Sequence, residues 1–121
     1  MTPTTPRTTQ SSWSWILQAI TGVLLVALLG FHMYANHFVV EGGLQTYADV
    51  VAYLAAPIIV VWEIVFLGVV TWHAMLGVRA IIFDFGLSRA AERTVTLILA
   101  VVGAAIVAYG LWLTYVIVTA G

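Results

Sequence analysis

Residues 72–86, WHAMLGVRAIIFDFG, place one histidine inside a run of apolar residues, with a glycine four positions later and an arginine two positions after that. Burying a polar imidazole among apolar side chains is costly unless it finds a partner, and an ionisable group at membrane depth is a candidate functional residue. In a helix, His73 and Gly77 lie one turn apart on the same face, where the glycine leaves a flat surface beside the imidazole. This arrangement suits a porphyrin, so we predict that His73 is an axial ligand of haem iron.

The composition indicates which solvent surrounds this chain. Of its 121 residues, 63% are hydrophobic and 7% are charged. A water-soluble domain of this size could not bury so much apolar surface, so we predict an integral membrane protein. The chain has no cysteine, which excludes disulfides, zinc–thiolate sites and cysteine-held iron–sulfur clusters within it. The net charge of −1 offers no basic surface to nucleic acid.

Three apolar segments, at about residues 15–38, 57–83 and 93–118, are each long enough to span a membrane as a helix. The predicted fold is therefore an all-α membrane protein with three transmembrane helices. Residues 1–12 are rich in Thr, Pro and Ser, and we expect them to be disordered or extended. A secretory signal is the alternative for the first segment, but its apolar stretch is long for one. Residues 44–54 have some helical periodicity and are expected to lie along the membrane interface.

The charges predict how these helices are oriented. All positive charges fall on one side of the three spans, at Arg7, Arg79, Arg89 and Arg93. The connection between the first two spans carries only the acidic residues Glu41 and Asp49. Cytoplasmic loops are enriched in positive charge. We therefore predict that the N-terminus and the loop at residues 84–92 are cytoplasmic, and that the C-terminus is outside.

In this orientation His32 and His73 lie at two depths. His32 is late in the first span, in the outer half of the membrane, and His73 is in the inner half. At the rise of a helix they differ in depth by more than about 10 Å, so they cannot be the two axial ligands of one iron. Each would need a second histidine from a partner helix. His37 is about 140° around the helix from His32, and we expect it to be an ordinary residue at the outer water boundary.

The residues alone leave other interpretations open. An intramembrane histidine can simply hydrogen-bond across a helix interface. Arg79 either extends its charge to the membrane surface or pairs with a haem propionate. Glu63 lies on a different face of the second span from His73, and is either a proton relay or a hydrogen-bonded structural acid. A transporter or channel is disfavoured, because three uniformly apolar spans contain no polar pore stripe and no internal repeat.

Residues 73–79, HAMLGVR, with Asp84 five residues later, resemble the H-x-x-x-G-x-R…D signature of succinate dehydrogenase membrane anchors. Residues 14–22, SWILQAITG, resemble the S-x-x-x-R-x-T/S-G opening of the same family. Phe31-His32, followed by Asn36-His37-Phe38, resembles the end of the first helix in di-haem anchors. The resemblance implies that His73 ligates an inner haem b and His32 an outer one, with Gly77 and Arg79 also at the cofactor.

The resemblance further implies a complex in the cytoplasmic membrane of a prokaryote. This chain would be the smaller, D-type anchor, and a second membrane-anchor subunit would supply the other two histidines. The iron–sulfur subunit, with the flavoprotein subunit, would dock on the cytoplasmic side near residues 7–15 and 79–93. Electrons from succinate would pass from the iron–sulfur subunit to a membrane quinone and equilibrate with haem. This chain would have no succinate site of its own.

One departure from the family pattern concerns the quinone. Many relatives have an arginine before the T-G pair, and there it lies at the quinone pocket with a nearby serine; this chain has Ala19, with Gln18 beside it. The residues expected to contact quinone are therefore Ser12, Ser14 and Gln18. The alternatives are a fumarate reductase anchor, a haem-free structural anchor, and a cytochrome b subunit of another quinone-linked dehydrogenase. The last resembles four-helix, four-histidine chains, which this chain does not.

Overall fold

The computed structural model describes residues 12–39, 41–43 and 46–120. In chain order the elements are α1 (Ser12–Tyr34), η1 (Ala35–Val39), α2 (Tyr47–Leu54), α3 (Pro57–Phe83) and α4 (Arg89–Ala120). η1 is a π-helix that continues α1 directly. Three stretches are long and apolar enough to cross a membrane, namely Ser12–Val39, Pro57–Phe83 and Arg89–Ala120. The predicted all-α fold with three spanning helices is confirmed, and the described residues contain no strand.

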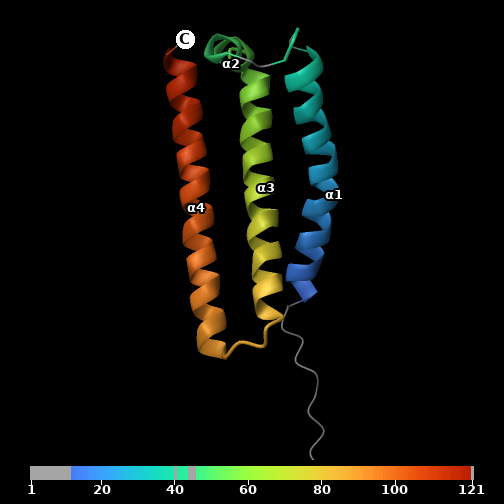
Figure 1. Ribbon diagram of the computed structural model, residues 1–121, viewed down its shortest axis with the longest axis vertical. Coiled ribbons are helices and arrows are strands. Elements are labelled where there is room, and N and C mark those ends of the chain that lie inside the picture. The colour runs from blue at the N-terminus through green and yellow to red at the C-terminus, as the bar shows by residue number, and fades with distance from the viewer. Residues whose placement is uncertain (1–11, 40, 44–45, 121) are drawn as a thin grey trace, which may run out of the picture.

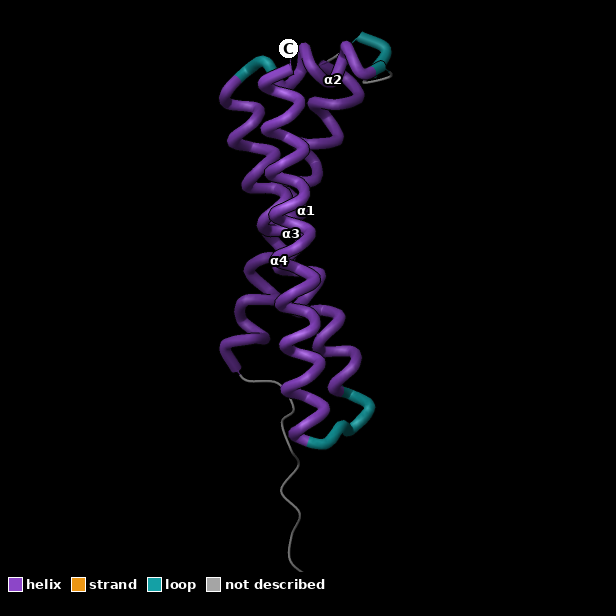
Figure 2. Tube along the Cα trace, turned by 90° about the vertical axis from the view of Figure 1, so that its left-hand side faces the viewer, coloured by secondary structure: helices purple, strands orange, loops and turns teal. Residues whose placement is uncertain are grey.

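The three long helices stand side by side, with α3 in the middle (Figure 1). It packs against α1 on one side and against α4 on the other. When the molecule is turned by 90° the helices overlap, so they form a single row rather than a closed bundle (Figure 2). Buried apolar side chains are consequently few, and in the described part of the chain they are Leu28, Ala35, Leu54 and Phe83. Large apolar side chains are exposed on all three long helices, which suits a surround of lipid or protein.

The two ends of the row differ in what they contain. The start of α1 and the connection between α3 and α4 lie at one end, whereas α2 and the C-terminal end of α4 lie at the other (Figure 1). Arg79, in the last turns of α3, and Arg89, the first residue of α4, therefore belong to the same end as the start of α1. This agrees with the grouping of charges expected from the sequence, although Arg7 lies outside the described residues. Which side of the membrane each end faces stays a prediction.

Local sequence signals explain where the helices begin. Pro57 occupies the first turn of α3, where its missing N–H costs no hydrogen bond. Thr46 starts α2 with a capping box. Gly86 has a φ of +72° and turns the chain after α3, in a conformation that a side chain would strain. The Ser88 hydroxyl then accepts a hydrogen bond from the Ala91 N–H at 3.3 Å and caps α4.

Helix boundaries differ from the predicted ones mainly at α4. It begins at Arg89 rather than near residue 93, because Ser88 caps a first turn within the segment expected to be a loop. The bounds of α3 agree with the predicted 57–83, and α2 is the helix expected from the periodicity of residues 44–54. Ser12, assigned to the extended N-terminal tail, is the first residue of α1. The rest of that predicted tail lies outside the described residues.

Glycine allows α3 and α4 to approach closely. A Cβ added at Gly103 would lie 3.1 Å from Met75 Cγ and 3.7 Å from Thr71 Cγ2. Small residues at such positions are typical of close helix packing in membranes. Gly30 on α1 differs, because within the described part of the chain nothing lies within 4 Å of an added Cβ.

Gly103→Val should therefore push α4 away from α3. We expect a loss of about 1–3 kcal/mol in the free energy of unfolding, the usual cost of overpacking a close contact. Thermal unfolding of the detergent-solubilised protein, followed by circular dichroism, measures this loss. Gly30→Val is the matched control, because it adds the same side chain to open space. Equal losses in the two variants would contradict close packing at Gly103.

Candidate functional site

His73 lies on α3 and contacts α1 across the seam between these two helices. Its Nδ1 is 2.9 Å from the hydroxyl oxygen of Thr21. The single proton of this hydroxyl goes to the carbonyl of Leu17, at 2.7 Å, or to that of Gln18, at 3.2 Å. In the tautomer in which the hydroxyl oxygen accepts from His73, the neutral imidazole carries its proton on Nδ1 and a lone pair on Nε2.

The residue after Thr21 leaves room for this imidazole. A Cβ added at Gly22 would lie 3.2 Å from His73 Cε1, the carbon between the two ring nitrogens. A side chain here would press on the ring at Cε1, on the side toward Nδ1, which lies 3.9 Å from the added Cβ. Gly77, one turn further along α3, has a different neighbour: an added Cβ would lie 3.2 Å from Gln18 Nε2. The role of Gly77 beside a porphyrin stays a prediction.

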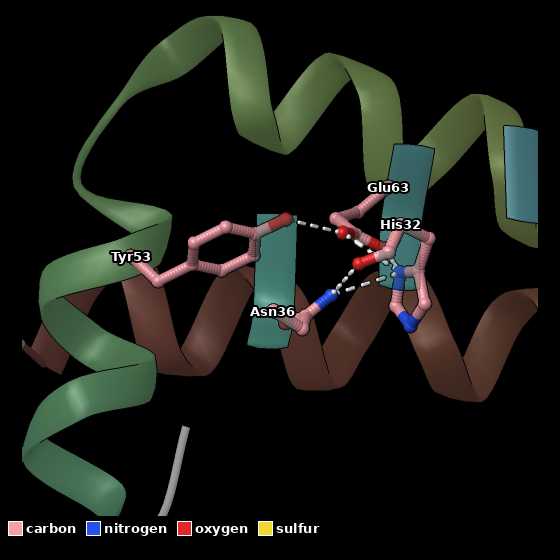
Figure 3. Close-up of polar contacts among 4 residues, drawn as sticks. All are labelled: His32, Asn36, Tyr53 and Glu63. Atoms are coloured by element: carbon pink, nitrogen blue, oxygen red, sulfur yellow. Dashed lines mark hydrogen bonds and ion pairs between the residues drawn. The ribbon is translucent and has the colours of Figure 1, made fainter. Parts of the chain in front are cut away.

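His32 lies near the end of α1 and pairs with Glu63 of α3 (Figure 3). Its Nδ1 is 2.9 Å from Oε2 and 3.0 Å from Oε1. With the carboxylate as acceptor, Nδ1 donates its proton, and in the neutral imidazole Nε2 again holds the lone pair. The Asn36 amide nitrogen lies 3.3 Å from Nδ1, but two donors cannot bond to each other. In Figure 3 the second ring nitrogen of His32 points away from these partners.

Three further residues hold this pair in place. Tyr53 of α2 donates its hydroxyl proton to Glu63 Oε1 at 2.7 Å. Asn36 donates to the backbone carbonyl of His32 at 2.6 Å, where α1 widens into η1. The Phe66 ring stacks on the His32 imidazole, with 4.7 Å between the ring centroids. Burial and the adjacent Glu63 carboxylate raise the pKa of Tyr53 above its ordinary value, so this phenol remains a hydrogen-bond donor.

The two pairs form separate polar contacts along one seam. Ten positions separate Glu63 from His73 on α3, and eleven separate Thr21 from His32 on α1. Both intervals correspond to about 15 Å of helix, so the antiparallel helices bring both pairs into register. The same rise keeps His32 and His73 too far apart to ligate one iron. A partner would therefore have to complete each site separately.

The predicted quinone residues lie along α1, between its N-terminal end and Thr21. Ser12 is the exposed first residue of the helix, Ser14 is buried and Gln18 is half-buried. Ser14, Gln18 and Thr21 share one face, because three or four positions separate successive members. Gln18 Oε1 is a buried acceptor that has no hydrogen-bond partner among the described residues. A buried acceptor without a partner needs an explanation, and one explanation is that a bound ligand donates a hydrogen bond to it.

Arg79 contacts α4 rather than either histidine. Its Nε donates to the Thr96 hydroxyl at 3.1 Å, and its guanidinium carbon lies 4.3 Å from the centre of the Phe83 ring. Its predicted place at the cofactor stays a prediction. His37 lies exposed in η1. Over the described ranges, no cluster of three or more His, Asp or Glu residues could hold a bare metal ion.

The partners of the two histidines are not apparent from the sequence. Thr21 and Gly22 form the T-G pair of the opening motif, and this motif is the one sequence feature that singles them out as candidate site residues. That signal does not say which residue of α3 they meet, because the meeting depends on helix register. Glu63 hydrogen-bonds both His32 and Tyr53, which agrees with its interpretation as a hydrogen-bonded acid.

Known proteins share this sequence pattern. Residues 4–113 match the family described as succinate dehydrogenase/fumarate reductase transmembrane subunit. The chain is 37% identical over 71 residues to the succinate dehydrogenase hydrophobic membrane anchor subunit of Archaeoglobus fulgidus, which covers 59% of this chain and 60% of that protein. It is 28% identical over 93 residues to the anchor subunit of the same name in Thermoplasma acidophilum, covering 77% of this chain and 76% of the relative.

A third relative is the succinate dehydrogenase 2 membrane subunit of Mycobacterium tuberculosis, 32% identical over 73 residues, or 60% of this chain and 53% of that protein. The matched stretches thus span between about half and three quarters of these relatives. The family match itself covers nearly the whole chain, and the three apolar helices are those of an integral membrane protein. The resemblance to succinate dehydrogenase membrane anchors is confirmed: this chain belongs to the family of succinate dehydrogenase/fumarate reductase transmembrane subunits.

Proposed function

We propose that this chain is a haem b-binding membrane anchor of a succinate dehydrogenase, with His32 and His73 as axial ligands of two different haems. The observation that carries the proposal is common to both histidines. Each has Nδ1 at 2.9 Å from an oxygen on the neighbouring helix, and in the tautomer that donates from Nδ1 each keeps the lone pair of Nε2. A metal-ligating histidine normally donates its other ring N–H to such a partner.

The residues fit a haem in further respects. The His32 ring has a second nitrogen directed away from its partners, and Phe66 stacks on its face. The His73 ring packs closely against Gly22 at Cε1 and Nδ1, which leaves Nε2 on the side of the ring away from this contact. Bound haem b would supply one-electron redox chemistry. The chain's own contribution is to fix the tautomer and orientation of each imidazole and to exclude water.

The single row of helices supports a shared site. A row leaves both faces of the α1–α3 seam uncovered by this chain, so a second membrane-anchor subunit can approach either histidine. That subunit would supply the opposite axial ligand of each haem. The iron–sulfur and flavoprotein subunits would dock on the cytoplasmic side, at the end that carries Arg79, Arg89 and Arg93. The N-terminus would face the same side and the C-terminus the other.

The same end of α1 is our candidate for quinone. Gln18 offers a buried acceptor that lacks a partner within the described chain, and a quinol hydroxyl is a suitable donor. Ser14 shares its helix face, and Ser12 lies at the helix start. Succinate oxidation itself would take place on the flavoprotein subunit, and its electrons would reach the quinone in the membrane. A fumarate reductase anchor would use the same residues, since the direction follows from the quinone potential.

One observation favours a haem-free structural anchor instead. Both imidazoles are already hydrogen-bonded within the chain, which satisfies one ring nitrogen of each and stabilises the α1–α3 seam. In this alternative the histidines only join helices.

A redox titration of the haem spectrum in the purified complex distinguishes these functions. Wild-type complex should show two b-type components. His32→Ala should remove one of them and His73→Ala the other, because each substitution deletes one axial ligand. If neither substitution changes the spectrum, any haem belongs to another chain and this one is only an anchor. A single component that disappears only with His73→Ala would leave His32 as a packing residue.

Gly22→Val tests the space beside His73. The added side chain should press on Cε1 and displace the ring, so the component assigned to His73 should weaken while that of His32 persists. The readout is the haem content of the purified complex from its pyridine haemochrome spectrum, together with the two-component titration. Gly30→Val provides the matched control on the same helix. Unchanged haem content in Gly22→Val would contradict the assigned ring position.

A further inference from the structure

We propose that Glu63 is a positioning residue that lowers the midpoint potential of the haem on His32, an inference that rests on the haem ligation proposed above. The two histidines use the same ring nitrogen but have acceptors of different charge. His32 pairs with a carboxylate and His73 with a neutral hydroxyl. Neither Glu63 nor Thr21 would touch the haem itself, so each acts through its histidine.

The contact with Glu63 is a charge-assisted one. Both carboxylate oxygens lie within 3.0 Å of His32 Nδ1, so the N–H faces the whole anionic group. Tyr53 adds a second donor to Oε1 at 2.7 Å, so the carboxylate is held between donors from α1 and α2. The Glu63 side chain is 18% exposed, which limits screening of its charge by water.

The contact with Thr21 is weaker for two reasons. A hydroxyl carries no net charge, and neutral hydrogen bonds have about half the strength of those to ionised groups. The hydroxyl also donates its proton to the carbonyl of Leu17 at 2.7 Å, and it is therefore held by the backbone of its own helix. His73 consequently donates to a fixed, neutral acceptor, with no carboxylate among the contacts of its ring in the described chain.

This difference should reach the iron through the imidazole. A carboxylate that accepts the Nδ1 proton makes the ring more electron-rich and Nε2 more basic. A more basic axial ligand stabilises ferric relative to ferrous iron, and hydrogen bonding around the ligands is one of the factors that set a haem's potential. The haem on His32 should thus be harder to reduce than it would be with a neutral acceptor in place of Glu63. Phe66, stacked on the His32 ring, keeps that ring in the orientation that the carboxylate selects.

Glu63→Gln in the complete complex is the decisive variant. Glutamine keeps the size of the side chain and an oxygen acceptor but removes the charge. The potential of the component lost in His32→Ala should rise, and at a fixed ambient potential its reduced-to-oxidised ratio should increase at least tenfold, which is 59 mV for one electron. Potentiometric titration measures the shift, and low-temperature EPR of the oxidised complex reports the altered ligand field independently. Retained haem with an unchanged potential would overturn the proposal.

Two other variants separate this effect from general damage to the seam. Thr21→Val is the matched control at the other histidine, and it should leave the potential of the His32 component unchanged. Tyr53→Phe removes a donor from the carboxylate, which leaves more negative charge facing His32, so the same potential should fall. Opposite shifts in Glu63→Gln and Tyr53→Phe are not expected from loosened packing. Equal shifts of both components in Glu63→Gln would therefore overturn the proposal.

The outcomes also distinguish the two proposals from each other. If His32→Ala leaves both haem components in place, the ligation fails and the assignment of potentials fails with it. If His32→Ala removes one component but Glu63→Gln leaves its potential unchanged, the ligation holds and only the positioning role is wrong. If the Glu63→Gln complex loses the outer haem, the Tyr53→Phe variant is the deciding test. A lower potential of the His32 component in Tyr53→Phe supports the role of the carboxylate, and an unchanged potential overturns it.

Discussion

The packing of α1 against α3 depends on one requirement of histidine in lipid. An imidazole has two ring nitrogens, and the one that carries the proton needs an acceptor where no water is available. Thr21 meets this requirement for His73, and Glu63 meets it for His32. Both acceptors come from the opposite helix, so each bond joins α1 to α3. The seam that satisfies the histidines is also the one that leaves their remaining nitrogens available.

Much of the fold could be predicted because long apolar segments in a membrane have few alternatives to a helix. The bounds of α3 followed from Pro57 at one end and from the polar residues after Phe83 at the other. The predicted start of α4 was too late along the chain. Its first turn contains charged residues that are typical of a loop, and the sequence did not indicate that Ser88 caps this turn. The row arrangement could not be predicted. Helices that are apolar on every side do not reveal which faces meet.

The site was predictable in part for a similar reason. A histidine is rare enough at membrane depth to be noticed on its own, so His32 and His73 could be selected from the sequence. Their acceptors could not, since threonine and glutamate have common structural uses and the contacts join positions 31 and 52 apart. Tyr53 was harder still, because it reaches Glu63 from the short helix α2 outside the spans. An interfacial tyrosine is ordinarily explained by its preference for the headgroup region.

The spacing of the two polar contacts restricts where residues can be inserted into or deleted from this chain during evolution. The intervals Thr21–His32 and Glu63–His73 correspond to nearly equal lengths of helix. One residue inserted within either interval would turn everything beyond it by about 100° and separate one of the two pairs. Insertions and deletions should therefore be tolerated in the connections at residues 40–46 and 84–88 and excluded from both intervals. The two contacts together therefore fix the separation of the two histidines along the membrane normal.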